Sequence, residues 1–331
     1  MKIAIVLLNW NGEKLLNVFL PTLIKNTNSS DIYVIDNNSH DNSIKLIKSN
    51  FPNIKCIQLK QNYGFAEGYN KGLGEIEADI FCLLNTDIEV TEDWLKPIYK
   101  VFKTHKDISI VQPNILDYNN RKSFEYSGAA GGYIDFYGYP YCRGRIFDSL
   151  EEDLGQYDNN ANIFWASGAC FFIRKKVWIS LGGFDNDFFA HFEEIDLCWR
   201  AFNNNFKAVS IGESKVYHIG GGTLPKSGFK SYLNFRNSLI LLTKNLPKKK
   251  LFKTLFIRLI LDFIMSFRFL IKGEFIAIIS LIRAHISFYL SFRHHYKKRT
   301  LNLNKKNYWS IKSIVWAYFI KKQRVFTKLS Q

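Results

Sequence analysis

Two polar side chains follow the apolar run that ends at Leu84, and they are of a kind that can bind a divalent cation. Asn85 and Asp87 stand two residues apart in LLNTDIEV (83–90), so both project from the same side of an extended turn. A carboxylate there can hold a cation that bridges diphosphate oxygens, because Mg²⁺ and Mn²⁺ favour oxygen ligands together with substrate phosphates. The alternative interpretation is an Asx-turn that ends a strand.

A second group of acids lies in HFEEIDLCWR (191–200), where the pattern predicts the start of a helix. Glu194 shares a stripe with apolar residues three, four and seven positions later, so it lies toward the apolar side of that helix. Partial burial raises the pKa of a carboxyl group and makes it a better general base. Asp196 instead faces Arg200 at i+4, a pair that can simply stabilise the helix. Glu194 is therefore the predicted general base.

The elements that must position these residues are short apolar runs separated by helical patterns. Continuous apolar strands bounded by helices indicate an α/β fold whose mainly parallel sheet is covered on both faces. Such sheets bind ligands beyond the carboxyl ends of their strands. The runs are 3–8, 32–35, 54–59 and 79–84. The segments that follow them are polar and turn-forming, and they are 9–12, 36–39, 61–64 and 85–87.

The net charge of +16 is unevenly distributed along the 331 residues. Residues 244–331 contain 20 Lys and Arg but only two acids, whereas the first 243 residues contain 25 basic and 27 acidic residues. This shift predicts a near-neutral globular domain at 1–243 and a basic helical region at 244–331. The five cysteines form no C-x-x-C pair, which is typical of a reduced cytosolic protein.

The polar strand ends, in order, strongly resemble the GT-A fold of glycosyltransferase family 2, a mixed, mainly parallel sheet flanked by helices. They read NWNG (9–12), DNNSHDNS (36–43), QNYGFAEGYN (61–70) and NTD (85–87). Later blocks resemble the rhamnosyltransferase-like branch of that family. They are WASGACFFIRK (165–175), GGFDNDFFAHFEEIDLCWR (182–200), VYHIGGGT (216–223) and YLNFRN (232–237). The resemblance covers roughly residues 1 to 243.

This resemblance implies a Mg²⁺ or Mn²⁺ site whose protein ligands are Asp87 and His218. Asn85, where many relatives carry Asp, is expected beside the nucleotide ribose. Ordinary loop chemistry is the alternative for each Asn and Gly, and glycine lets a backbone approach a ligand closely. The other residues that the resemblance places around the nucleotide are Asn9, Asn11, Asp36, Asn37, Asn62, Gly64 and Asn70.

The same resemblance implies an acidic pair where this chain has Glu193 and Glu194. Relatives commonly carry Glu-Asp here, so the longer second side chain leaves the choice of base between the two, with Glu194 favoured and Asp196 as a neighbouring acid. Arg236 either reaches the diphosphate or pairs with a surface acid. Trp165 is either a wall of the acceptor site or a core residue, because an aromatic face suits a sugar ring. Two small residues complete the expected acceptor side, Gly168 and Ala169.

The basic region predicts a helix on an anionic membrane surface. No stretch between 248 and 299 reaches about 18 apolar residues without a charge, which disfavours a spanning helix. The charged residues of 250–272 fall within about half of a helical wheel, as in helices that lie in the interface of an anionic leaflet. They are Lys250, Lys253, Arg258, Asp262, Arg268 and Lys272. A helical subdomain with a solvated basic face is the alternative, and the long apolar faces argue against nucleic acid as a partner.

Together these features predict an inverting, metal-dependent glycosyltransferase of cell-surface polysaccharide or lipopolysaccharide biosynthesis. The expected donor is a dTDP- or UDP-sugar, such as a rhamnose donor, and the expected acceptor is a glycan or a polyprenyl-linked sugar. The expected location is cytoplasmic, peripheral on the inner face of the cell membrane. Two alternatives stay open: a sugar-nucleotide nucleotidyltransferase of the same fold, and a non-catalytic membrane or nucleic-acid adaptor. The oligomeric state does not follow from the sequence.

Overall fold

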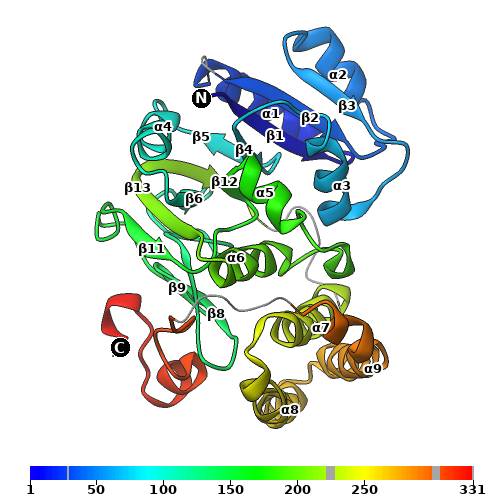
Figure 1. Ribbon diagram of the computed structural model, residues 1–331, viewed down its shortest axis with the longest axis vertical. Helices are drawn as coiled ribbons and strands as arrows, with labels where there is room; N and C mark the ends of the chain where they lie inside the picture. The colour runs from blue at the N-terminus through cyan, green and yellow to red at the C-terminus, as the bar shows by residue number, and fades with distance from the viewer. Residues whose placement is uncertain (28–29, 221–227, 300–305, 330–331) are drawn as a thin grey trace.

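The computed structural model describes all residues except 28–29, 221–227, 300–305 and 330–331. Within the described residues a nine-stranded sheet has the order β11-β13-β6-β12-β4-β1-β2-β3, and β5 pairs with β13 (Figure 1). The strands are β1 (Ile3–Asn9), β2 (Asp31–Asp36), β3 (Lys55–Gln58), β4 (Ile80–Leu84), β5 (Ile88–Val90), β6 (Ile108–Asp117), β11 (Ala161–Ile163), β12 (Cys170–Arg174) and β13 (Lys207–His218). This is the mixed α/β architecture that the sequence predicts.

The first part of the sheet is parallel. β1 pairs in parallel with both β2 and β4, and β2 pairs in parallel with β3. All five residues of β4 are buried, because helices cover both faces of this part of the sheet. These helices are α1 (Glu13–Lys25), α2 (Ser43–Asn50) and α3 (Gly64–Leu73), whereas α4 (Leu95–Thr104) packs against β6 and β13. The four apolar runs are therefore strands, as predicted.

The second part of the sheet contains the antiparallel pairs. β12 pairs antiparallel with β4 and β6, and β13 pairs antiparallel with β5 and β11. The apolar sequence NIFWASGACFFI (162–173), whose pattern alone predicts one strand, forms parts of two strands, because residues 164–169 leave the sheet between β11 and β12. The segment 117–161, which lacks clear sequence periodicity, also contains a small four-stranded antiparallel sheet. Its strands are β7 (Gly132–Ile134), β8 (Pro140–Cys142), β9 (Arg145–Ile146) and β10 (Ser149–Leu150).

Five α-helices follow β12 in the sequence, among the described residues. They are α5 (Lys175–Leu181), α6 (Glu193–Asn203), α7 (Gly228–Asn245), α8 (Lys248–Ile271) and α9 (Phe275–Lys297). α8 and α9 lie at the end of the molecule opposite the N-terminal strands (Figure 1). α7 crosses position 243, and the buried Lys244 forms ion pairs with Asp185 and Asp196 of the preceding part. The basic region is therefore tied to the part before residue 244 by ion pairs of the buried Lys244.

The charged side of α8 differs from the expectation for an interfacial or solvated helix. Arg258 and Asp262 are buried, each with 2% of its surface exposed. Arg258 packs over the ring of Tyr139 and donates to Ser238 Oγ, and Asp262 Oδ2 lies 3.0 Å from His285 Nε2 of α9. The prediction that these charges face outward is wrong, because they pair with neighbouring elements instead.

Candidate functional site

A cavity of about 370 Å³ opens at the carboxyl ends of β1, β2 and β4. Parallel strands direct their following loops to one edge of the sheet, so residues far apart in sequence meet there. Asn11, Asn37, Asn62 and Gly64 line the cavity together with Asn85 and Asp87. The other lining residues are Leu8, Trp10, Gly12, Leu15, Phe65, Thr86, Phe189 and Ala190.

Asn9 and Asp36 lie just behind the cavity and hold two strand ends together. Asn9 Nδ2 donates to Asp36 Oδ1 at 2.9 Å and to Ser39 Oγ at 3.1 Å, and the Ser39 amide donates to Asp36 Oδ2 at 3.0 Å. Both side chains are almost fully buried. In this structure they shape the wall of the cavity and do not themselves line it.

A network of amide groups shapes the other side of the cavity. Asn37 Nδ2 donates to Asn62 Oδ1 and to the Gly64 carbonyl, each at 2.9 Å. The Tyr63 amide donates back to Asn37 Oδ1 at 2.9 Å. Gly64 has a φ of +75°, and a Cβ there would lie only 3.0 Å from the Phe189 ring. Glycine is therefore needed at this position for both conformation and space.

Asp87 and His218 meet because β5 pairs with the end of β13. The antiparallel register places His218 opposite Ile88, next to Asp87. His218 Nε2 lies 3.1 Å from Asp87 Oδ1 and 3.4 Å from Asn85 Nδ2. The oxygen of Asp87 and the nitrogen of His218 are donors of the kind that Mn²⁺ and Mg²⁺ sites use. Of the glycine run after His218, Gly221 and Gly222 lie outside the described residues.

Glu125 is a functional candidate that the sequence reasoning missed. Its Oε2 lies 3.4 Å from His218 Nδ1, and only 4% of Glu125 is exposed. Burial lowers the pKa of His218, but hydrogen bonds with Asp87 and Glu125 outweigh it and raise that pKa to about 10. Glu125 lies in a segment without periodicity, 93 positions before His218. The one available signal was an isolated acid between two aromatic residues, which is weak.

Glu193 and Glu194 begin α6 after a loop of unusual backbone conformation. Phe189, His191 and Phe192 have φ values of +64°, +68° and +74°. Non-glycine residues rarely adopt such values, and they occur often at functional sites. The Oε2 atoms of both glutamates have no hydrogen-bond partner among the described residues. Both carboxyl groups can therefore accept a further ligand or proton.

Burial perturbs both acids in the same direction. Burial and the neighbouring Glu194 raise the pKa of Glu193 well above its usual value. Burial also raises the pKa of Glu194, to about 7, although backbone N–H groups at the start of α6 and at Gly168 lower it in part. A carboxyl group with a pKa near neutrality suits proton transfer at physiological pH.

Gly168 and Ala169 connect Glu194 to the cavity. The Asn85 amide donates to the Ala169 carbonyl at 2.9 Å, so the start of β12 lies beside the end of β4. A Cβ on Gly168 would lie 3.7 Å from Phe65, which lines the cavity, and 3.8 Å from the Glu194 carboxyl carbon. Glu194 therefore lies next to the cavity, behind a residue without a side chain.

Four of the residues expected at the site lie elsewhere. Trp165 is 2% exposed and donates to the Tyr133 carbonyl, as the core alternative for this residue requires. Asn70 bonds Phe184 and Asn186, outside the cavity. Asp196 is fully buried and pairs with Arg200, Lys244 and Asn245. Arg236 donates to the carbonyls of Asp187 and Phe188, and among the described residues it forms no ion pair with an acid.

Arg236 and the next residue fix the loop that precedes α6. Asn237 Nδ2 lies within 2.7–2.9 Å of the carbonyls of Phe188, Ala190 and His191. The Asn237 side chain projects from α7 and is buried. Its three contacts hold the loop before α6 in its left-handed conformation. The YLNFRN block thus positions the acidic pair, a role that its sequence alone did not indicate.

Comparison with known proteins gives relatives of one enzyme class. The chain is 25% identical over 250 residues to the low-salt glycan biosynthesis hexosyltransferase Agl10 of Haloferax volcanii, covering 72% of this chain and 74% of the relative. It is 23% identical over 215 residues to an N-acetylglucosaminyl-diphospho-decaprenol L-rhamnosyltransferase of Mycobacterium tuberculosis, covering 56% of this chain and 66% of the relative.

The solved structures give the same fold. GalNAc-T7, crystallised with UDP, GalNAc and Mn²⁺, superposes with a TM-score of 0.57 at 16% identity, over 73% of this chain and 47% of the GalNAc-T7 chain. The fold is GT-A, and the chain is a glycosyltransferase with relatives that include a rhamnosyltransferase. Residues 4–182, more than half of the chain, match the family described as Glycosyl transferase family 2. The chain belongs to this family.

Proposed function

We propose that this glycosyltransferase is an inverting, metal-dependent enzyme of cell-surface polysaccharide or lipopolysaccharide biosynthesis. It transfers a hexose or deoxyhexose, with rhamnose as the first candidate, from a dTDP- or UDP-sugar. The proposed catalytic domain is 1–243, and the proposed membrane-associating region is 244–331. One observation carries the proposal: Asn85 and Asp87 line the cavity, His218 contacts both of them, and Glu194 lies close to the same cavity beside Gly168.

Asp87 and His218 fit a divalent cation by their chemistry and spacing. Their facing atoms, Oδ1 and Nε2, lie 3.1 Å apart and are both buried, so one cation can take both as ligands. The cation supplies positive charge that offsets the charge developing on the leaving diphosphate. Asn85 contributes an amide, so the site has one carboxylate fewer than it would have with Asp at this position. We therefore assign Asn85 to the sugar nucleotide and not to the metal.

Glu194 is the proposed general base. Its carboxylate accepts the proton of the acceptor hydroxyl while that oxygen attacks C1 of the sugar, and the diphosphate leaves from the opposite face. The configuration at C1 is inverted in this single displacement, so no protein nucleophile is needed. Burial favours the neutral form of Glu194 and so makes its carboxylate a stronger base. Glu193 is the alternative base, and we assign Asp196 to the fixing of α6.

The nucleotide is proposed to bind between the Asn37–Asn62 pair and the exposed ring of Trp10. Trp10 is 54% exposed and lines the cavity beside Asn11. The name of the Mycobacterium tuberculosis relative includes a decaprenol-linked sugar acceptor, which supports a polyprenyl-linked acceptor for this chain. An acceptor of that kind places the enzyme on the cytoplasmic face of the membrane.

A transfer assay tests the proposal. Purified full-length protein is incubated with a panel of dTDP-, UDP- and GDP-sugars and an undecaprenyl-diphosphate-linked N-acetylglucosamine acceptor, with Mn²⁺, with Mg²⁺ or with EDTA. We expect transfer from one nucleotide class that EDTA abolishes. Glu194→Gln should reduce it by about 100- to 10,000-fold, the usual contribution of a general base.

The matched control is Glu213→Gln, which makes the same change at an exposed position of β13. It should transfer at the wild-type rate. Full activity of Glu194→Gln together with loss in Glu193→Gln would move the base to Glu193. Release of pyrophosphate from a nucleoside triphosphate, with no sugar transfer, would contradict the proposal and favour the nucleotidyltransferase.

A further inference from the structure

We propose that α8, α9 and the groove beside Trp316 form a membrane-docking face that inserts apolar side chains into an anionic lipid leaflet. This inference deepens the membrane location under the proposed function and rests on it. It specifies which side of the helices meets lipid, and it has a readout independent of sugar transfer. The occupant is the bilayer itself: acyl chains against the apolar side chains and phosphate headgroups against the flanking lysines.

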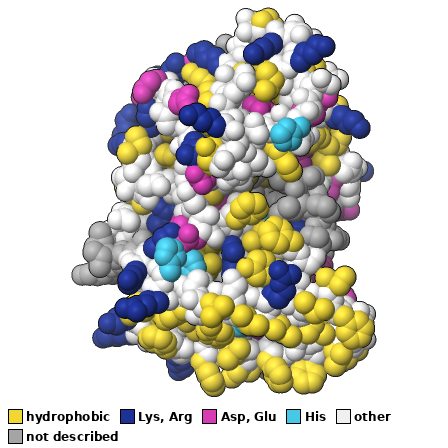
Figure 2. Space-filling view, turned by 90° about the vertical axis from the view of Figure 1, so that its right-hand side faces the viewer, with side chains coloured by type: hydrophobic (Ala, Val, Ile, Leu, Met, Phe, Trp, Pro, Cys, Tyr) yellow, Lys and Arg dark blue, Asp and Glu magenta, His cyan; other side chains and the backbone are white. Residues whose placement is uncertain are grey.

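The outward side of α8 is apolar along its length. Figure 2 shows apolar side chains gathered over the end of the molecule where Figure 1 places α8 and α9. Six of the outward residues of α8 are between 44% and 86% exposed, and they are Phe256, Ile260, Phe263, Ile264, Phe267 and Ile271. Monomeric soluble proteins rarely expose a continuous apolar surface of this kind, and such surfaces mark membrane or protein contacts.

α9 continues the same surface. Its outward apolar residues are between 51% and 84% exposed, and they are Phe275, Ile276, Ile279, Ile282, Ile286 and Leu290. By length and composition alone, α9 is also apolar enough to cross a membrane, with a mean hydropathy of 1.7. Only 28% of its most apolar window is buried, so the protein interior does not account for its hydrophobicity.

The polarity of the hairpin is inverted relative to a helix pair in water. A surface helix normally turns its apolar stripe inward and its charges outward. Here Arg258, Asp262 and His285 are at most 8% exposed, and Asp262 and His285 join α8 to α9 at 3.0 Å. Buried polar groups of this kind need partners, and these have them within the protein. Lys253 and Arg283 are exposed among the apolar outward residues, and long cationic side chains of this kind can reach the headgroup level while their stems stay in the apolar layer.

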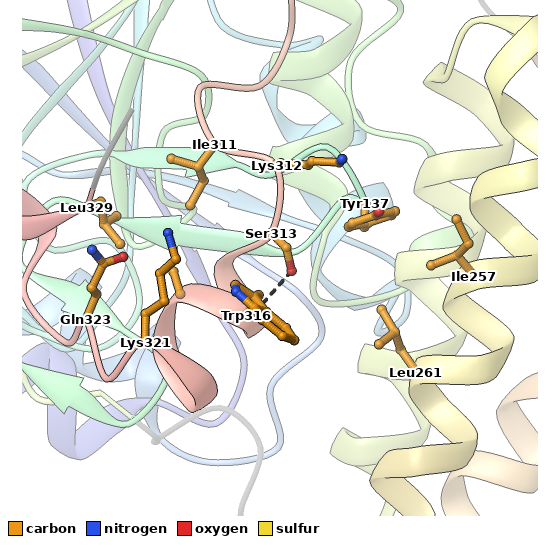
Figure 3. A pocket seen from close by; sticks show the side chains of 11 residues that line it. Tyr137, Ile257, Leu261, Ile311, Lys312, Ser313, Trp316, Lys321, Gln323 and Leu329 are labelled. Atoms are coloured by element: carbon orange, nitrogen blue, oxygen red, sulfur yellow. Dashed lines mark hydrogen bonds between the residues drawn. The ribbon is translucent and has the colours of Figure 1, made fainter.

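The groove beside α8 provides a place for a lipid headgroup. It has a volume of about 500 Å³ and lies between α8 and residues 311–329 (Figure 3). Ile257 and Leu261 face it from α8, and the Trp316 ring, 57% exposed, lies across from them. Lys312 and Lys321 are exposed on the same groove. Tryptophan and lysine are typical residues of a membrane–water interface.

Charge complementarity favours an anionic leaflet over a second copy of this chain. Residues 244–331 carry 20 cations and two acids, and one of those acids, Asp262, is buried. Two such faces would repel each other, whereas anionic headgroups would attract both. A protein interface also carries about one hydrogen bond per 100–200 Å². The twelve outward positions named above offer no side-chain donor or acceptor.

Vesicle flotation tests the proposal on the full-length protein. The probes are vesicles of phosphatidylglycerol with phosphatidylcholine, and vesicles of phosphatidylcholine alone. We expect the protein to float with the anionic vesicles and much less with the neutral ones. The triple variant Phe256→Gln, Phe263→Gln and Phe267→Gln should lower the partition coefficient roughly 100-fold, which corresponds to about 2.7 kcal/mol. High salt should weaken binding in part, because it screens only the electrostatic component.

The matched control changes three exposed apolar residues outside the hairpin, Val18→Gln, Leu154→Gln and Ile179→Gln, which are 55%, 81% and 62% exposed. It should bind vesicles as the wild type does. Binding of dTDP and UDP, measured by calorimetry, should be the same in all three proteins, so a loss of vesicle binding cannot reflect unfolding. Wild-type protein that binds neither vesicle, or that forms a dimer in sedimentation which the Phe triple variant dissociates, would overturn the proposal. Vesicle binding without any sugar transfer would leave the docking face standing and contradict the transferase reaction.

Discussion

Replacing Glu125 by Gln should weaken metal binding while leaving the fold intact. The two side chains have nearly the same shape, but the amide loses the charge that faces His218 Nδ1 at 3.4 Å. A carboxylate behind a metal-bound histidine fixes the orientation of the ring and makes it a stronger ligand. Loss of such a partner typically costs 10- to 100-fold in metal affinity, or about 1.4–2.7 kcal/mol.

The half-saturating Mn²⁺ concentration for sugar transfer should therefore rise by about 10- to 100-fold in Glu125→Gln. Transfer at saturating Mn²⁺ should recover most of the wild-type rate, which separates a positioning role from a catalytic one. Gly220→Ala should act in the same direction. A Cβ there would lie 2.7 Å from Glu125 Oε1, and the φ of +71° disfavours alanine.

The control for this change is Glu89→Gln on the neighbouring strand. Glu89 pairs with Arg121 at 2.9 Å and lies opposite Tyr217 in the strand register. Glu89→Gln removes one negative charge from β5, as Glu125→Gln removes one beside His218, but it leaves the proposed metal ligands unchanged. The reasoning would be refuted by a Glu125→Gln protein with unaltered Mn²⁺ dependence, or by an equal shift in Glu89→Gln.

Three further changes test other parts of the molecule. The pH profile of kcat/KM should have its acid limb near pH 7 and fall about tenfold per pH unit below it, because Glu194 must be ionised to accept a proton; a limb near pH 4.5 would contradict this. Trp10→Ala should weaken the binding of UDP or dTDP about tenfold or more, because the base loses the exposed ring on which it is proposed to stack. Calorimetry measures this loss of affinity, and thermal unfolding should show an unchanged stability. Lys244→Met should lower the free energy of unfolding by about 3 kcal/mol, because Asp185 and the buried Asp196 each lose one of their cationic partners. Urea titration measures this, and an unchanged midpoint would argue against it.

The strand ends were predictable because the local alternation of apolar runs and helical patterns decides where each strand stops. Apolar runs flanked by helices gave β1, β2 and β4 with small errors at their ends, and parallel pairing then brings their following loops to one edge. That is why Asn11, Asn37 and Asp87 line one cavity in the structure. The contact of His218 with Asp87 was expected only from family resemblance, since it depends on the register between β5 and β13.

Other positions could not be predicted because long-range contacts decide them. Asn70 and Arg236 carry polar groups suited to a nucleotide, yet both bind backbone groups of the 184–188 segment. Their sequence neighbours do not reveal that this segment passes beside them. In α8 the helical wheel placed the charged residues within one half of the circumference, but the structure buries Arg258 and Asp262 and exposes Lys253 and Lys272. Arg258 faces inward because its guanidinium packs over the Tyr139 ring and donates to Ser238 Oγ of α7.

The contacts of α9 link the proposed docking face to the proposed base. Lys298, just after α9, donates to Asp185 at 2.9 Å and Asp187 at 2.6 Å, and His294 lies 2.7 Å from Asp187. These acids begin the loop that leads into Glu194, and α7 holds the middle of the same loop through Asn237. Deletion of 244–331 would therefore remove two anchors of that loop as well as the membrane face. Because these anchors are lost, we expect the truncated chain to bind nucleotide but to transfer sugar slowly to a water-soluble acceptor. The Phe triple variant keeps the anchors and should transfer sugar to that acceptor at the wild-type rate.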